Sequence, residues 1–172
     1  MDYAQYRRMI QMDDKVWGDK SGFRLFLTTR VFRLIRFYRW TKYFQDKRSC
    51  FVLYQFCRIF YHRLCVKCGC DIPSHATIGG GFKLIHPNGI VINSKAVIGD
   101  NVTMLSGALI GSNHTGVPTV GDNVYIGAHA LVIGNVHIGN NATIGAGAIV
   151  THDVPDNAVA ICDAAHIIRK DN

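Results

Sequence analysis

Residues 120–150 read VGDNVYIGAHALVIGNVHIGNNATIGAGAIV, and this stretch decides the fold. An aliphatic residue recurs at every sixth position: Val120, Ile126, Val132, Ile138, Ile144 and Val150. A second apolar series follows each of these by four positions: Val124, Ala130, Val136, Ala142, Ala148 and Val154. Gly, Asn and Asp, which tolerate tight corners and positive φ, fill many of the positions between. A six-residue period suits neither an α-helix nor a simple hairpin, but it is typical of a parallel β-helix whose short strands stack coil upon coil.

The same period continues upstream with two interruptions. Its aliphatic positions there are Ile72, Ile78, Leu84, Ile92, Ile98, Met104 and Ile110. The interval from Leu84 to Ile92 is two residues too long, and the interval from Ile110 to Val120 is four too long. The second excess falls in SNHTGVPT, residues 112–119, and predicts a loop that projects from the coil.

Composition divides the 172-residue chain near Cys70. Residues 1–70 hold 15 Lys and Arg against 5 Asp, and 16 of the 18 aromatic residues, whereas residues 71–172 hold 4 Lys and Arg against 7 Asp. Every acidic residue of the chain is Asp. We therefore predict two domains, a basic aromatic helical segment over 1–70 and a mainly β domain over 71–172.

The basic segment contains FRLFLTTRVFRLIRFYRWTKYF at residues 23–44, with a cation at every third position from Arg30 to Lys42. On a helix these cations form a slanted stripe beside an apolar side. Residues 51–66 predict a second, more aromatic helix. Two interpretations stay open for residues 23–66: contact with an anionic membrane surface, or packing between helices or subunits. No nucleic-acid motif accompanies the charge, so nucleic acid is not expected as a partner.

The N-terminal sequence lacks the order of a secretory signal, and no run approaches the ~18 apolar residues of a membrane span. We therefore expect a cytoplasmic protein, located in one interpretation at the inner face of the membrane. Cys65, Cys68 and Cys70 form a compact group with His62. A zinc site and thiols on the buried side of a helix are the two explanations, and the absence of a second paired-ligand motif favours the thiols.

The six-residue series as a whole resembles the hexapeptide-repeat acyltransferases, over about 100 of the 172 residues. The resemblance implies a left-handed parallel β-helix preceded by an α-helical N-terminal segment. It also implies a homotrimer with acyl-CoA sites in the grooves between subunits, and acetyl-CoA as acyl donor with no metal required.

A narrower resemblance, to the serine acetyltransferase branch, is carried by DIPSHATIGGGFKLIHPNGIVI at residues 71–92. That branch has a catalytic Asp and His fifteen positions apart, a spacing that Asp71 and His86 share. Transfer from a thioester to a hydroxyl needs a base, and neutral His is the usual one near pH 7. The resemblance makes His86 this base and Asp71 the group that orients it. His114, at the loop entrance, is the rival base or a contact of the acceptor.

The same resemblance places the pantetheine arm of CoA along the repeat after the loop, at Gly127 and Ala128. Gly111, Ser112 and Ala146 are weaker candidates for the CoA site.

Two departures from the serine acetyltransferase pattern bear on the acceptor. The Asp that precedes the catalytic His in that branch is Ile85 here, and a basic Arg-His pair in its loop is replaced by Gly116 and Val117. A small charged amino acid needs paired counter-charges, so these losses favour a sugar hydroxyl over serine. We therefore expect an O-acetyltransferase of a surface polysaccharide or its precursor. Serine acetylation and a non-catalytic β-helix scaffold are the alternatives.

Overall fold

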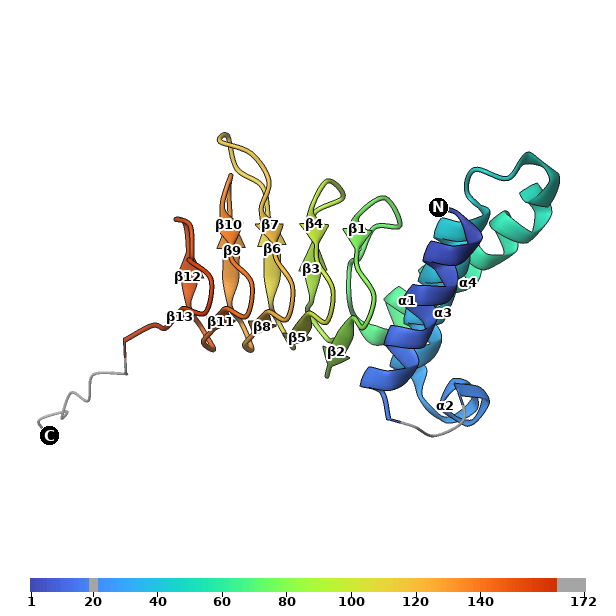
Figure 1. Ribbon diagram of the computed structural model, residues 1–172, viewed down its shortest axis with the longest axis horizontal. Coiled ribbons are helices and arrows are strands. Elements are labelled where there is room, and N and C mark those ends of the chain that lie inside the picture. Colours follow the sequence, from blue (N-terminus) through green and yellow to red (C-terminus); the bar gives the residue numbers. More distant parts are fainter. Residues whose placement is uncertain (19–21, 164–172) are drawn as a thin grey trace, which may run out of the picture.

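The computed structural model describes residues 1–18 and 22–163, which form a group of helices followed by a row of stacked β coils (Figure 1). The helices are α1 (Tyr3–Val16), α2 (Gly22–Thr28), α3 (Arg30–Phe44) and α4 (Phe51–Cys68), with a short 3₁₀ turn at Arg48–Cys50 before α4. The run predicted as one helix over 23–44 is interrupted at Thr29, whose extended backbone separates α2 from α3. The mainly β fold with a helical N-terminal segment is confirmed.

Three parallel sheets form the three faces of the coil. The first face holds β1 (Thr77–Ile78), β4 (Val97–Ile98), β7 (Thr119–Val120) and β10 (His137–Ile138). The second holds β2 (Lys83–Ile85), β5 (Thr103–Leu105), β8 (Tyr125–Ile126), β11 (Thr143–Ile144) and β13 (Val159–Ala160). The third holds β3 (Val91–Ile92), β6 (Leu109–Gly111), β9 (Leu131–Ile133) and β12 (Ile149–Val150). Each strand pairs with the strand one coil away, so the faces run along the long axis in Figure 1.

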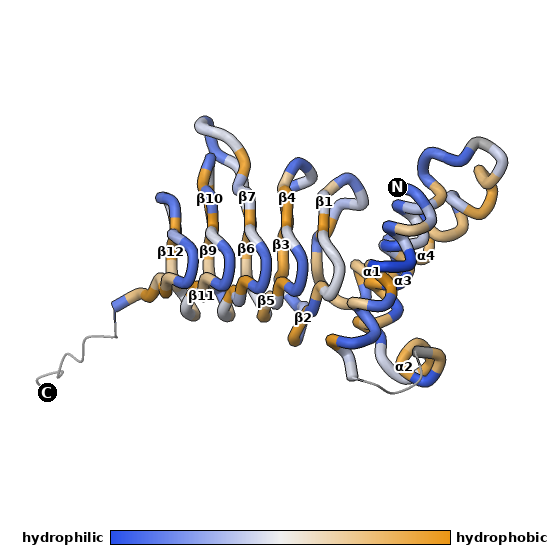
Figure 2. The backbone as a smooth tube through the Cα atoms, viewed as in Figure 1, coloured by the Kyte–Doolittle hydropathy of each residue, from blue (hydrophilic) through white to orange (hydrophobic). Residues whose placement is uncertain are grey.

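The aliphatic residues of the six-residue series point into the coil, as predicted. On the second face the inward column is Leu84, Met104, Ile126 and Ile144, all buried. In Figure 2 apolar and polar residues alternate along each coil. The core is continuous with that of the helices, because one cluster of buried apolar residues runs from Leu34 to Val154.

A ladder of asparagines fixes the corner between the first and second faces. Asn101, Asn123, Asn141 and Asn157 all have a positive φ, between 56° and 60°. Each side-chain amide donates to the next one at 3.1 Å. Asn adopts the left-handed conformation more readily than most residues, so the sequence supplies the corner geometry and a polar ladder together.

The helices are attached to the first coil by a buried ion pair. Arg39 is 1% exposed and Asp13 2% exposed; Arg39 Nε and Nη2 donate to the Asp13 carboxylate at 2.9 and 3.1 Å. Arg39 Nη1 also donates to the carbonyl of Ile78 at 2.6 Å, and the amide of Gly81 donates to Asp13 at 2.8 Å. The pair therefore joins α1, α3 and the first coil, and Arg39 does not contribute to an exposed basic stripe.

Two other cations of the predicted stripe are also engaged within the fold. Arg33 donates to the carbonyls of Phe26 and Leu27 at the end of α2, and Arg36 pairs with Asp14 on α1. Arg30, at the start of α3, is exposed and forms no ion pair among the described residues. Within residues 1–18 and 22–163, no helix has the length and apolar character needed to cross a membrane.

The division into domains at residues 70 and 71 stays a prediction, and its last residues, 164–172, lie outside the described part of the chain. Helix α4 ends at Cys68, Gly69 adopts a left-handed conformation with φ 65°, and Asp71 forms the first bridge of the coil, with Val91.

We expect Asp13→Asn to lower the free energy of unfolding by about 3–5 kcal/mol, because it leaves Arg39 as an uncompensated buried charge. The matched control is Arg8→Gln, which removes the exposed Arg8–Asp100 pair and should cost at most about 1 kcal/mol. Urea unfolding followed by circular dichroism measures both. Equal losses for the two variants would contradict the role given to the buried pair.

Stability should fall steeply in alkali because of Tyr38 and Tyr61. Tyr38 donates to the carbonyl of Ala76 at 2.6 Å and Tyr61 to that of Ile72, both buried. Burial raises the pKa of Tyr38 to about 12 and also raises that of Tyr61. An unfolded tyrosine ionises near pH 10, so this stability is complete below about pH 10 and is lost as the pH rises toward 12. Melting temperatures from pH 8 to 12 test this, and Tyr38→Phe should make the alkaline decline shallower.

Candidate functional site

The corner that carries His86 is two residues longer than the equivalent corner of the next coil. Ile85 pairs with Leu105, and the amide of Gly107 donates to the carbonyl of Asn88 at 2.9 Å, which stacks Gly107 on Gly89. Three residues, 86–88, therefore occupy a corner for which the next coil uses Ser106 alone. This is the structural origin of the two-residue excess between Leu84 and Ile92.

The extra length brings His86 to the outside of the coil. His86 is exposed and has a φ of 50°, a left-handed conformation that few non-Gly residues adopt. A side chain held in this way stands clear of the hydrogen-bonded strands and is free to contact a ligand.

Small residues occupy the same corner in the following coils. Ser106, Ala128 and Ala146 each precede a stacked residue with positive φ, namely Gly107, His129 and Gly147. The amides of Ala128 and Ala146 donate no hydrogen bond within the described residues, whereas the amide of Gly127 donates to Ile144 at 2.8 Å. The corner is therefore a row of small side chains with free backbone donors, and it lies on the same edge of the coil as His86.

His86 also lines an open cleft between the coil and the helices, which we call the corner groove. Its volume is about 690 Å³, and its lining residues are Arg30, Val31, Val66, Lys67, Cys68, Gly69, His86, Pro87 and Asn88. The groove contains two cations and no acidic side chain. Arg30 Nη1 donates to the carbonyl of Lys67 at 3.3 Å, which links the start of α3 to the end of α4.

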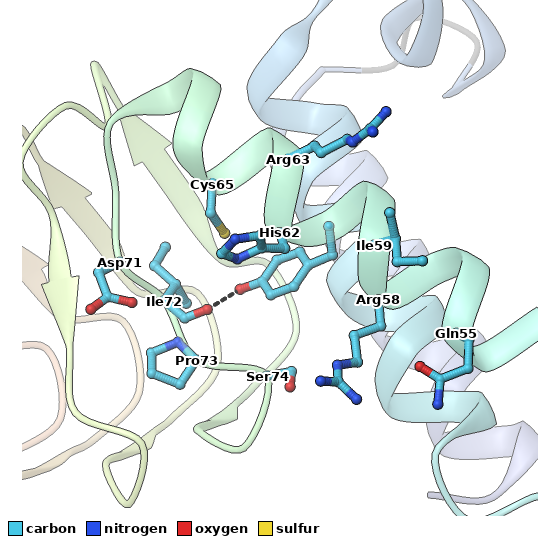
Figure 3. Close-up of a pocket in the computed structure, with 11 residues that line it drawn as sticks. Gln55, Arg58, Ile59, His62, Arg63, Cys65, Asp71, Ile72, Pro73 and Ser74 are labelled. Carbon is cyan, nitrogen blue, oxygen red and sulfur yellow. Dashed lines mark hydrogen bonds between the residues drawn. The ribbon is translucent and has the colours of Figure 1, made fainter.

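Asp71 lies in a second groove, between α4 and the start of the coil (Figure 3). This groove has a volume of about 480 Å³ and is lined by Asp71–Ser74 of the coil and by Arg58, His62 and Cys65 of α4, among others. Figure 3 shows Arg58 and His62 facing this coil segment while Arg63 points away. Contact with the Cys70 thiol lowers the pKa of Cys65.

The carboxylate of Asp71 forms no hydrogen bond or ion pair with His86 among the described residues. Both side chains are exposed and both lie beside the last turns of α4. The catalytic pairing of Asp71 with His86 stays a prediction.

The remaining predicted site residues lie at a different corner. His114 is exposed in the loop between β6 and β7, which is closed by a bridge between Asn113 and Gly116. Gly111 ends β6, and Ser112 accepts a hydrogen bond from Asn93 at 3.0 Å. These residues join the third face to the first, whereas His86, Ala128 and Ala146 join the second to the third. Within one chain the predicted site is thus divided between two edges of the coil.

Sequence reasoning missed the helical residues that line the two grooves. Arg30 and Arg58 were assigned only to helices, His62 was considered only with the neighbouring cysteines, and Lys67 was given no role, whereas Arg30 and Lys67 lie beside His86 and Arg58 and His62 beside Asp71. The excess of Lys and Arg over Asp in the first 70 residues was the one sequence feature that pointed to these side chains. It shows that some cations have no acidic partner, but it does not show which of them face the coil.

Comparison with known proteins supports the repeat architecture. Residues 118–152 match the family described as Bacterial transferase hexapeptide (six repeats). Over 111 residues the chain is 37% identical to the putative colanic acid biosynthesis acetyltransferase WcaB of Escherichia coli (strain K12), which covers 62% of this chain and 68% of WcaB. Over 105 residues it is 45% identical to the probable serine acetyltransferase 1 of Oryza sativa subsp. japonica, covering 57% of this chain but only 34% of that protein.

Among solved structures, the chain superimposes on serine acetyltransferase isoform 3 of Entamoeba histolytica, solved in complex with cysteine, with a TM-score of 0.79 and 24% identity. The match covers 98% of this chain and 62% of the other. It shows the fold, a left-handed parallel β-helix after a helical segment, as predicted. The chain belongs to the hexapeptide-repeat acyltransferases.

Proposed function

We propose that the chain is an acetyl-CoA-dependent O-acetyltransferase whose acceptor is a sugar hydroxyl of a surface polysaccharide or of its precursor. The observation that carries the proposal is the position of His86. This exposed histidine lies on a lengthened corner and lines an open groove. The same corner of the following coils is a row of small residues with free backbone amides. The similarity to WcaB, described as a colanic acid biosynthesis acetyltransferase, supports a glycan acceptor.

The proposed reaction requires one base. The neutral imidazole of His86 takes the proton of the acceptor hydroxyl while the hydroxyl oxygen bonds to the thioester carbonyl carbon. The carbon–sulfur bond then breaks, and the CoA thiolate leaves with the proton that the imidazolium returns. Asp71 stabilises the imidazolium if the two exposed side chains rotate together when substrates bind; catalytic hydrogen bonds often tighten only in such a complex.

The row of small residues suits the acyl donor. A pantetheine arm carries two amides, and the free N–H groups of Ala128 and Ala146 are donors for its carbonyl oxygens. The absence of large side chains at Ser106, Ala128 and Ala146 leaves room for the arm to follow the edge of the coil toward His86.

A homotrimer would reunite the two halves of the predicted site. The third face carries an outward apolar column, Val91, Leu109, Leu131 and Ile149, with Ile149 67% exposed. Packing of this face against another copy buries the column. The edge with His86 and Ala128 in one copy can then face the edge with Ser112 and His114 in its neighbour.

Serine is the second candidate acceptor, and the similarity to the rice protein named as a serine acetyltransferase supports it. Against it, Ile85 is apolar and half-buried next to His86, and the loop residues Gly116 and Val117 bring no charge. A non-catalytic scaffold is the third candidate, and the absence of CoA binding would favour it.

We also propose that the chain works at the inner face of a membrane. Apolar side chains are strongly exposed on α2 and at the start of α4, including Phe23 at 73%, Phe51 at 61% and Val52 at 82%. Exposed aromatic residues beside a large excess of cations suit an anionic lipid surface.

His86→Ala should abolish acetyl transfer to glycan fragments while leaving the Kd for CoA within about two-fold, because the base does not hold the donor. Asp71→Asn should lower kcat by about 10²-fold or more. Thiol release, with serine in parallel as acceptor, and calorimetric titration with CoA provide the two measurements. The control is His75→Ala, another exposed histidine of the first coil. Transfer to serine but not to glycans would reject the glycan acceptor, and retained activity in His86→Ala would reject the base.

Leu131→Arg should dissociate the trimer, because it places a charge in the centre of the apolar column. Sedimentation should show a monomer, and acetyl transfer should fall together with the trimer. Val97→Arg on the first face, where Val97 is 46% exposed, is the control and should remain trimeric. A trimeric Leu131→Arg protein, or an active monomer, would contradict the shared site.

A further inference from the structure

The corner groove adjoins a second, apolar groove between α2, α3 and α4, with which it shares two lining residues. This apolar groove has a volume of about 650 Å³ and is lined by Phe26, Arg30, Arg33, Phe37, Phe60, Leu64 and Lys67. Arg30 and Lys67 line both grooves. From the coil outward, the surface therefore presents His86, then two cations, and then a groove of aromatic and aliphatic side chains.

We propose that the acceptor is an amphiphile: a glycan attached through a phosphate to a hydrocarbon chain. The sugar lies at His86, the phosphate between Arg30 and Lys67, and the first part of the hydrocarbon in the apolar groove. This inference rests on the proposed acetyl transfer for the role of His86, but the phosphate and hydrocarbon sites stand on their own observations.

The two cations are available for an anion. Arg30 uses one N–H group to bond the carbonyl of Lys67, and a guanidinium has five N–H donors, so four remain. Neither Arg30 nor Lys67 forms an ion pair among the described residues, and neither groove has an acidic lining residue. In contrast, Arg33 in the apolar groove is occupied by two carbonyls of α2 and serves to position that helix. Arg30 and Lys67 are therefore the pair that a phosphate would meet.

The apolar groove suits a hydrocarbon better than a nucleobase. Phe37 is 7% exposed; its ring stacks on Phe60 at 5.5 Å and meets Trp40 edge-on at 5.0 Å, so its faces are already used. The lining includes no Asn, Asp, Ser or Thr to hydrogen-bond the edge of a base. Phe60 is 39% exposed and Leu64 half-buried, which leaves apolar surface for an aliphatic chain.

Charge disfavours a second copy of the chain as the occupant. A two-fold contact through this groove would bring the Arg30 and Lys67 of both copies together, with no acidic side chain from either groove to separate them. A phosphate supplies the missing negative charge.

Binding of farnesyl phosphate to the full chain tests the site without any acetyl transfer. Trp40 packs against Phe26 and Phe37, at 5.8 and 5.0 Å between ring centroids, so its fluorescence should report on the groove. We expect farnesyl phosphate to bind at least about ten-fold more tightly than farnesol or inorganic phosphate, because it alone engages both parts.

The variants separate the two parts of the site. Arg30→Gln and Lys67→Gln should each weaken farnesyl phosphate about ten-fold and leave farnesol unchanged. Phe60→Ser should reduce the advantage of farnesyl phosphate over inorganic phosphate. The matched controls are Lys95→Gln, an exposed lysine of the coil, and Val52→Ser, an exposed apolar residue of α4 outside both grooves; both should bind as the unaltered protein does.

Equal affinity for farnesyl phosphate and inorganic phosphate would overturn the proposal. Tighter binding of uridine diphosphate than of farnesyl phosphate would also overturn it. A change of oligomeric state in Phe60→Ser would overturn it as well, because the groove would then be a contact between subunits. In an acetyl-transfer assay, an oligosaccharide carrying prenyl phosphate should have a higher kcat/KM than the free oligosaccharide. If the binding pattern holds but no acceptor is acetylated, the lipid-phosphate site stands and the proposed function fails.

Discussion

Every coil of the β-helix must hydrogen-bond in register with the next one, and this constraint limits where the chain can change. The amides of Thr103, Tyr125 and Thr143 donate to the carbonyls of Val124, Ala142 and Ala158 in the following coil, all between 2.9 and 3.0 Å. An extra residue within a strand would reverse the inward and outward faces and expose the core. Extra residues are therefore accommodated at corners. Within the described coils, residues are added to the period at two places, the lengthened corner of His86 and the loop of His114, and both carry candidate chemistry.

The helical segment shows how a chain with no Glu uses an excess of cations. Arg39 is neutralised by Asp13 in the interior, Arg36 pairs with Asp14, and Arg33 binds carbonyl groups of α2. The cations that face the interior of the fold are therefore paired with two aspartates of α1 or bonded to backbone carbonyls. Those at the junction with the coil, Arg30 and Lys67, remain exposed and unpaired among the described residues, and they lie next to the one histidine that the lengthened corner lifts out of the coil.

The sequence was sufficient to predict the repeating coil, but it was not sufficient to predict how the helices contact the first coil. A period of six residues specifies which side chains point inward and where corners fall, because each coil repeats the same local geometry. The excess lengths near His86 and His114 could therefore be located before any coordinates. The burial of Arg39 could not, since it depends on the carbonyls of Ile78 and Gly79, which reach Arg39 only when α3 docks on the first coil. The helix break at Thr29 was missed because both flanking segments have the same composition.

The docking of the helices also explains why the candidate site lies in the first coils rather than elsewhere along the β-helix. Similar corners recur at Ser106, Ala128 and Ala146, but only the first corner lies beside α3 and α4, which supply side chains longer than any the coil presents there. A regular coil alone offers a narrow edge of small residues, suited to an extended arm such as that of CoA. The helices add walls, charge and apolar surface on one side of His86. A donor that follows the coil and an acceptor that approaches from the helices would then meet at the imidazole from opposite directions, which is the arrangement that transfer between two bound substrates requires.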